Sequence, residues 1–121
     1  MKRLSILLLL AGEMLIAQPR RVLYVTHSAG FRHDCLPLSA RVLEELGARS
    51  GTLSVTSTED LSLLSGPSLA GYDAVVFYTS GELPISPAQK QDLLAFVRTG
   101  KVLEAPTARR TRCIHGRNTE I

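Results

Sequence analysis

Apolar residues along this chain fall into short unbroken runs and into longer stretches with helical spacing. Residues 22–26 and 74–78 are apolar at nearly every position, which is typical of strands buried on both faces. Residues 53–59 alternate apolar and polar side chains. This alternation predicts a strand nearer the edge of a sheet.

Two further stretches carry apolar residues at helical spacing. We expect Asp34 to cap the first helix and Gly47 to end it. The second helix is predicted to begin with Ser86 as its N-cap and Gln89 closing a capping box, and to end at Gly100. Its expected buried residues are Leu93, Leu94, Phe96 and Val97.

The order of these segments is strand, helix, strand, strand, helix, with residues 61–72 as a loop that holds at most one helical turn. Strands that alternate with amphipathic helices predict an α/β fold with a mostly parallel sheet flanked by helices. Sites in such sheets lie in the loops beyond the carboxyl ends of the strands. Two loops qualify, one at residues 27–33 and one at residues 79–82.

Composition bounds the class of protein. The chain has 121 residues, of which 45% are hydrophobic, so wholesale disorder is excluded. Two cysteines are too few for a disulfide scaffold. The net charge of +3 comes from the two ends, because residues 20–100 carry seven basic side chains against eight acidic ones. The charge therefore does not predict a nucleic-acid partner.

Residues 1–17 have the layout of a secretory signal peptide. A basic start, Lys2-Arg3, precedes an apolar run, and Ala17 supplies the small residue before a cut at Gln18. The run is too short for a stable membrane anchor. The mature domain is thus expected to be secreted or periplasmic. The alternative is that these residues form a buried first strand or helix.

The loop after the first strand carries most of the candidate chemistry. His27 and His33 are candidate catalytic residues because imidazole moves protons near neutral pH. Arg32 offers two parallel hydrogen bonds to an oxygen-rich ligand. The structural alternative is that His33 caps the helix and Arg32 pairs with Asp34 or Glu82. The candidate substrate-binding residues are Ser28, Gly30, Phe31, Arg32, Thr79 and Ser80.

Several common sites are excluded by their missing residues. The loop has a single glycine, Gly30, where a dinucleotide fingerprint needs three, and it lacks the Gly-Lys-Ser/Thr of a phosphate loop. The acidic residues of a phosphoacceptor domain are absent after the first and third strands. A zinc site on His27 and His33 lacks a third ligand. No metal and no cofactor are predicted.

Residues 25–34, Val-Thr-His-Ser-Ala-Gly-Phe-Arg-His-Asp, resemble the first motif of the trehalose-utilisation, ThuA-like family. The likeness extends over residues 21–100, with Gly-Phe-Arg-His as its most specific part. The resemblance implies a flavodoxin-like sheet related to class I glutamine amidotransferases, a link to sugar utilisation and a small-molecule sugar or sugar derivative as partner. It does not imply amidotransferase chemistry, because these relatives hold a histidine-containing motif where amidotransferases hold a nucleophilic cysteine.

Beyond Gly100 the likeness is lost, and residues 101–121 show no strand or helix period. Ordinary codons for these residues, read two bases on, encode GLGGTHSATDTLYPWPEYGD, which contains the HSATDT expected of the family. We therefore interpret residues 101–121 as a non-native, disordered tail produced by a frameshift near Gly100. Its residues Arg109, Arg110, Arg112, Cys113 and His115 then have no selected role.

These observations predict that residues 20–100 are the N-terminal part of a secreted, sugar-related ThuA-like domain that is catalytically incomplete. A non-catalytic carbohydrate-binding or interaction module of the same fold is the alternative. A third hypothesis is an unrelated nucleotide-binding protein, and the missing phosphate loop argues against it.

Overall fold

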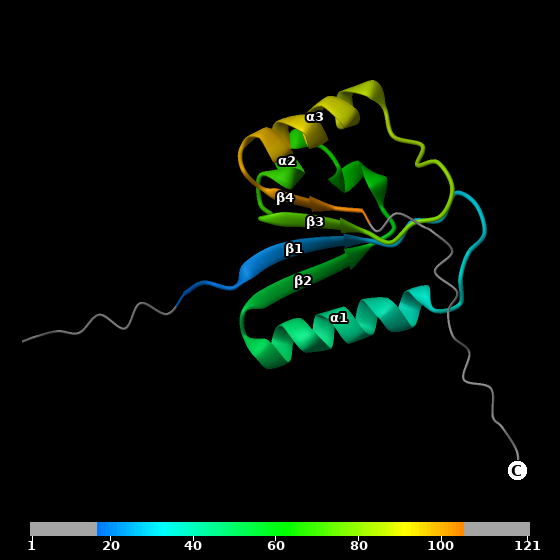
Figure 1. The fold of residues 1–121 in the computed structure, drawn as a ribbon. Coiled ribbons are helices and arrows are strands. Elements are labelled where there is room, and N and C mark those ends of the chain that lie inside the picture. The colour runs from blue at the N-terminus through cyan, green and yellow to red at the C-terminus, as the bar shows by residue number, and fades with distance from the viewer. Residues whose placement is uncertain (1–16, 106–121) are drawn as a thin grey trace, which may run out of the picture.

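A computed structural model describes residues 17–105 (Figure 1). Its four strands form one all-parallel sheet in the order β2-β1-β3-β4. The α/β fold with a mostly parallel, helix-flanked sheet is therefore confirmed, in a form consistent with part of a flavodoxin-like domain. The elements are β1 (Arg20–Val25), α1 (Leu36–Ser50), β2 (Leu53–Thr58), a 3₁₀ turn (Leu61–Leu63), α2 (Gly66–Leu69), β3 (Ala74–Phe77), α3 (Pro87–Arg98) and β4 (Val102–Glu104).

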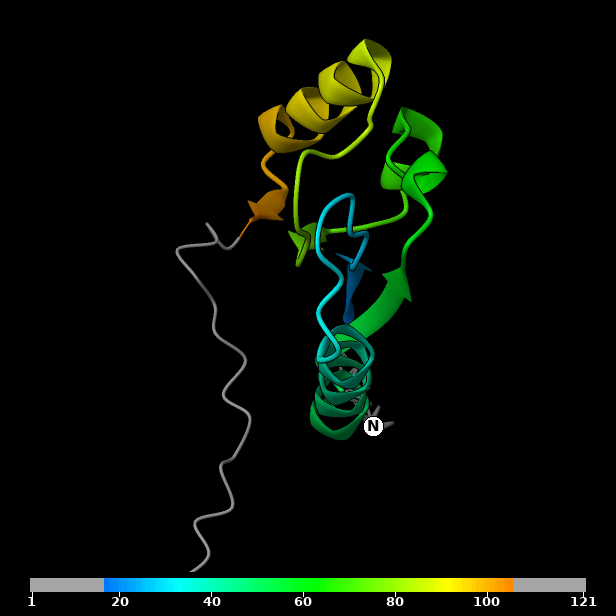
Figure 2. The same ribbon diagram turned by 90° about the vertical axis from the view of Figure 1, so that its right-hand side faces the viewer.

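The helices lie on opposite faces of the sheet (Figure 2). On one face α2 and α3 close the main core, whose buried residues are Leu23, Val25, Leu64, Leu69, Val75, Phe77 and Phe96. On the other face α1 runs along β2, and Tyr24 of β1 donates a hydrogen bond from its hydroxyl to Ser39 of α1 at 3.1 Å. Burial of Tyr24 raises its pKa above the ordinary value.

Helix α1 begins and ends later than the sequence predicts. Its N-cap is Cys35 rather than Asp34, and no side chain caps its first turn. It ends at Gly51, whose φ of 66° suits glycine, rather than at Gly47. Gly47 serves close packing instead, because a Cβ there would lie 3.0 Å from the carbonyl oxygen of Leu53.

Helix α3 begins as predicted. Ser86 accepts a hydrogen bond from the Gln89 backbone N–H, and the Gln89 side chain accepts one from the Ser86 N–H. The prediction of which α3 residues are buried is only partly correct. Phe96 is buried, but Leu94 and Val97 are exposed because α3 turns one side only towards the sheet.

The expectation that no strand follows Gly100 is wrong. Residues 102–104 form β4, which pairs in parallel with β3 through Ala74 and Val102. The strand shows no period because it is three residues long and both Val102 and Leu103 are exposed. Residues 1–16 and 106–121, including the predicted leader and Cys113, lie outside the described residues. Within residues 17–105 no helix is long and apolar enough to cross a membrane.

Candidate functional site

The two predicted loops meet at the carboxyl edge of the sheet. Ser28 and Ser80 form a parallel bridge beyond β1 and β3. The carbonyl oxygen of Ser80 accepts hydrogen bonds from the backbone N–H groups of Ala29 at 2.9 Å and Gly30 at 3.2 Å. The Ser80 hydroxyl donates to the Phe31 carbonyl at 2.5 Å. The sequence therefore placed both loops correctly at one edge.

Gly81 allows these loops to approach. Its φ is +75°, and a Cβ at this position would lie 2.8 Å from the backbone nitrogen of Gly30. Any larger residue would push the two loops apart. Gly30, a predicted binding residue, thus contributes backbone contacts to the joint between the loops.

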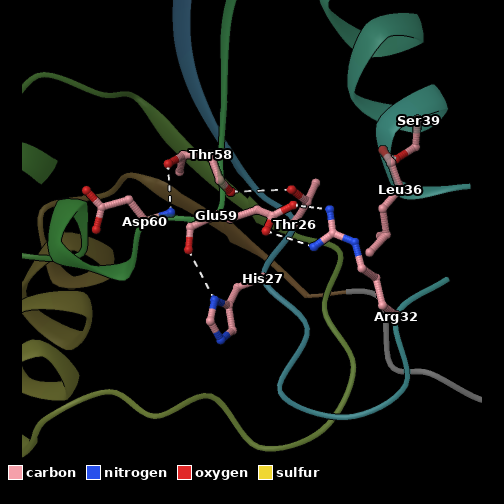
Figure 3. Close-up of polar contacts among 8 residues, drawn as sticks. All are labelled: Thr26, His27, Arg32, Leu36, Ser39, Thr58, Glu59 and Asp60. Carbon is pink, nitrogen blue, oxygen red and sulfur yellow. Dashed lines mark hydrogen bonds and ion pairs between the residues drawn. The ribbon is translucent and has the colours of Figure 1, made fainter. Parts of the chain in front are cut away.

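Arg32 pairs with Glu59, the residue that follows β2 (Figure 3). Its two terminal nitrogens donate to the two carboxylate oxygens of Glu59 at 2.9 and 2.5 Å. The expected alternative partners, Asp34 and Glu82, are wrong, because β2 lies beside β1 and brings Glu59 to the loop. The guanidinium holds the pKa of Glu59 below its ordinary value. Both side chains remain about half exposed.

His27 contacts the same residue through the backbone. Its Nδ1 lies 3.1 Å from the carbonyl oxygen of Glu59 (Figure 3). Because a carbonyl oxygen can only accept, this contact requires the proton on Nδ1. Neutral His27 then has its Nε2 lone pair available, which is the state that a general base needs.

Within residues 17–105, no hydrogen bond or ion pair joins the His33 side chain to this cluster. Its ring stands edge-on to Phe31, with the ring centroids 5.0 Å apart. Phe31 is 74% exposed. The His33 carbonyl accepts the backbone N–H of Leu36 and so helps to start α1. Thr79 is partly buried beside Ser80, and its side chain makes no hydrogen bond within residues 17–105.

A cavity of about 320 Å³ lies between the Arg32–Glu59 pair and the start of α1. The buried Thr26 lines it, and its hydroxyl donates to the Thr58 carbonyl at 3.4 Å. The residues lining the cavity are Thr26, Arg32, Leu36, Pro37, Ala40, Ser57, Thr58 and Glu59. This combination of aliphatic wall, charge pair and hydroxyls suits a small polar ligand.

Sequence reasoning assigned no role to Glu59, although the residue organises the site. The available signal was its position at the carboxyl end of the strand predicted over residues 53–59. Asp60 stands next to it and accepts hydrogen bonds from the backbone and hydroxyl of Ser62, which lower the Asp60 pKa. Within residues 17–105 no cluster of three His, Cys, Asp or Glu side chains could hold a metal ion.

Comparison with protein families assigns the chain to a family. The family model described as ThuA, trehalose utilisation, matches residues 21–103. The chain belongs to the ThuA family. Comparisons with curated proteins and with solved structures give no significant match.

The ThuA match includes every residue of the candidate site. It begins at Arg21 in β1 and ends at Leu103 in β4, so it extends past the predicted boundary at Gly100. ThuA is a class I glutamine amidotransferase-like family, in agreement with the parallel sheet. Family membership associates the chain with trehalose utilisation.

Proposed function

We propose that the chain is the N-terminal part of a secreted ThuA domain that binds a trehalose-type sugar at the carboxyl edge of its sheet. The observation that carries this proposal is the Arg32–Glu59 pair, with His27 on the carbonyl of Glu59, inside the segment that matches the family. The pair lies beside a cavity large enough for a small ligand.

The chemistry of the pair fits a polyhydroxylated molecule. Each sugar hydroxyl both donates and accepts hydrogen bonds, so a guanidinium and a carboxylate together serve neighbouring hydroxyls. Leu36 and Pro37 supply an apolar wall for the C–H face of a sugar ring. His27, through its Nε2, would accept a proton from a bound hydroxyl or water, and His33 is the second candidate for proton transfer.

Catalytic incompleteness is part of the proposal. The sheet ends at β4, which is three residues long and has an open outer edge among the described strands. In our interpretation the frame of the coding sequence changes near Gly100, just before this strand, so the histidine motif expected from the resemblance is missing. Sequencing of the genomic DNA tests this: an absence of the shifted open reading frame overturns the frameshift.

Secretion rests on the leader-like residues 1–17. We expect expression in a bacterial host to yield a chain that begins at Gln18 and is recovered from the periplasm. Mass determination of the N-terminus checks this. A chain that retains Met1 in the cytoplasmic fraction contradicts it.

The decisive test is ligand titration of the chain and of a frame-restored version, using trehalose and keto-sugars and following amide chemical shifts. Binding should change the amide chemical shifts of the residues around Glu59, and this change should be lost in Arg32→Ala. Arg98→Ala, an exposed arginine on α3, is the matched control and should bind normally. Equal effects of the two variants, or no binding at all, overturn the proposal.

Turnover separates the two forms of the function. If the frame-restored chain converts the sugar and His33→Ala or His27→Ala abolishes conversion, the domain is an enzyme. Binding without turnover supports the carbohydrate-binding module instead.

A further inference from the structure

The helices of residues 17–105 cover only part of the sheet face that carries α1. Helix α1 lies along β2, while β3 and β4 have no helix over them on this side among the described residues (Figure 2). A groove of about 430 Å³ runs there between α1 and the sheet. Its walls are largely apolar and consist of Tyr24, Ser39, Val42, Leu43, Leu46, Val76 and Tyr78.

Helix α1 presents an apolar stripe beside this groove. Leu38, Val42 and Leu46 are four residues apart, so they line one side of the helix. They are 54%, 46% and 54% exposed. The same helix also buries Leu36 and Gly47 against its own sheet, so it has apolar residues on two sides. The second apolar side of this helix would be buried only if another element packed against it.

The charges that flank the stripe are self-complementary. Arg41 and Glu45 are exposed, one helical turn apart, and neither makes an ion pair among residues 17–105. When two copies of α1 pack antiparallel about a two-fold axis, Arg41 of each copy lies opposite Glu45 of the other. Two ion pairs then border a contact made by Leu38, Val42 and Leu46.

We propose that this stripe and groove form a homodimer interface, in which α1 of a second copy packs antiparallel against α1 and closes the open face over Val76. Elsewhere the sheet is covered by helices, so a helix is the kind of element expected over this groove. Among the described helices, α1 is the one whose exposed stripe borders the groove. Because the interface is isologous, one contact closes both grooves.

The test is sedimentation equilibrium of the full chain over a range of concentrations. The chain should be a dimer, and Leu46→Glu should raise its dissociation constant at least about a hundredfold, because the new carboxylate is buried without a partner. Leu94→Glu is the matched control, since Leu94 is 48% exposed on α3, away from the groove, and should leave the dimer intact.

A charge exchange separates direct pairing from misfolding. Arg41→Glu and Glu45→Arg should each weaken the dimer by about tenfold, and the double variant should restore it, because the opposite charges again face each other. A chain that stays monomeric at all concentrations overturns the proposal. It is also overturned by assemblies that survive Leu46→Glu or by a double variant no stronger than the singles.

Discussion

The two faces of the sheet differ in how completely they are covered, although the same strands build both. On the closed face Val75 is fully buried under α2 and α3, whereas its neighbour Val76 points to the open face and is only partly buried. β1 is buried on both faces because α1 reaches it. Burial in this fold is therefore decided by which helix lies over a strand, not by how apolar the strand is.

The largest expected effect is the loss of a side chain from the closed face. Leu69→Ala should lower the free energy of unfolding by about 2–5 kcal/mol, because Leu69 is 2% exposed and its removal leaves a cavity. Leu46→Ala on the open face is the matched change and should cost less than about 1 kcal/mol in the monomer. Urea denaturation of dilute samples measures both. Equal losses would mean that the two faces are equally covered.

The next prediction tests how tightly α1 packs against β2. Gly47→Ala places a Cβ 3.0 Å from the Leu53 carbonyl and 3.2 Å from Val55, so α1 must move away from β2. We expect a loss of about 1–3 kcal/mol from overpacking. Ala48→Gly, at the next position, controls for helix propensity and should cost about 1 kcal/mol. A neutral Gly47→Ala would show that α1 is loosely held.

The pattern of apolar residues was enough to predict the strands at residues 22–26, 53–59 and 74–78 and the capping box of α3, because each depends on local sequence. It was insufficient for β4, since this strand is too short to show a period and is held by its pairing with β3. It also misjudged Leu94 and Val97, because an apolar residue on a helix does not show whether another element covers it.

The candidate site also contains features that the sequence could predict and features that it could not. The loops at residues 27–33 and 79–82 could be predicted, because carboxyl ends of parallel strands share one edge. The partner of Arg32 could not be predicted, because it depends on which strand lies next to β1. The strand order places β2 there, and Glu59 follows β2.

A smaller effect concerns the start of α3, the helix that closes the core. Ser86→Ala removes the hydrogen bond that the Ser86 hydroxyl accepts from the Gln89 N–H. This change should lower the free energy of unfolding by about 1 kcal/mol. Ser65→Ala is the matched change, because Ser65 is the N-cap of α2 but its side chain caps no backbone N–H. It should cost under about 0.5 kcal/mol. Thermal unfolding of both variants measures the difference, and a reversed order contradicts the role of the box.

The smallest expected change in stability concerns the Arg32–Glu59 pair at the carboxyl edge of the sheet. Glu59→Gln weakens the pair with Arg32, and because both side chains are about half exposed, the Tm should fall by less than in Ser86→Ala. The pKa of Glu59 is held below its ordinary 4.5 in the folded state, so the pair's contribution is present above pH 4.5 and is lost as the pH falls through the lowered value.

The difference in Tm between the native chain and Glu59→Gln should therefore be present from pH 5 to pH 8 and should vanish at lower pH. Asp60, whose pKa is also lowered, titrates in both chains and cancels from the difference. Glu44→Gln, an exposed carboxylate on α1 without an ion pair among residues 17–105, should show no such pH dependence. A difference that persists unchanged at low pH would mean that the Glu59 carboxylate contributes through its shape rather than through its charge.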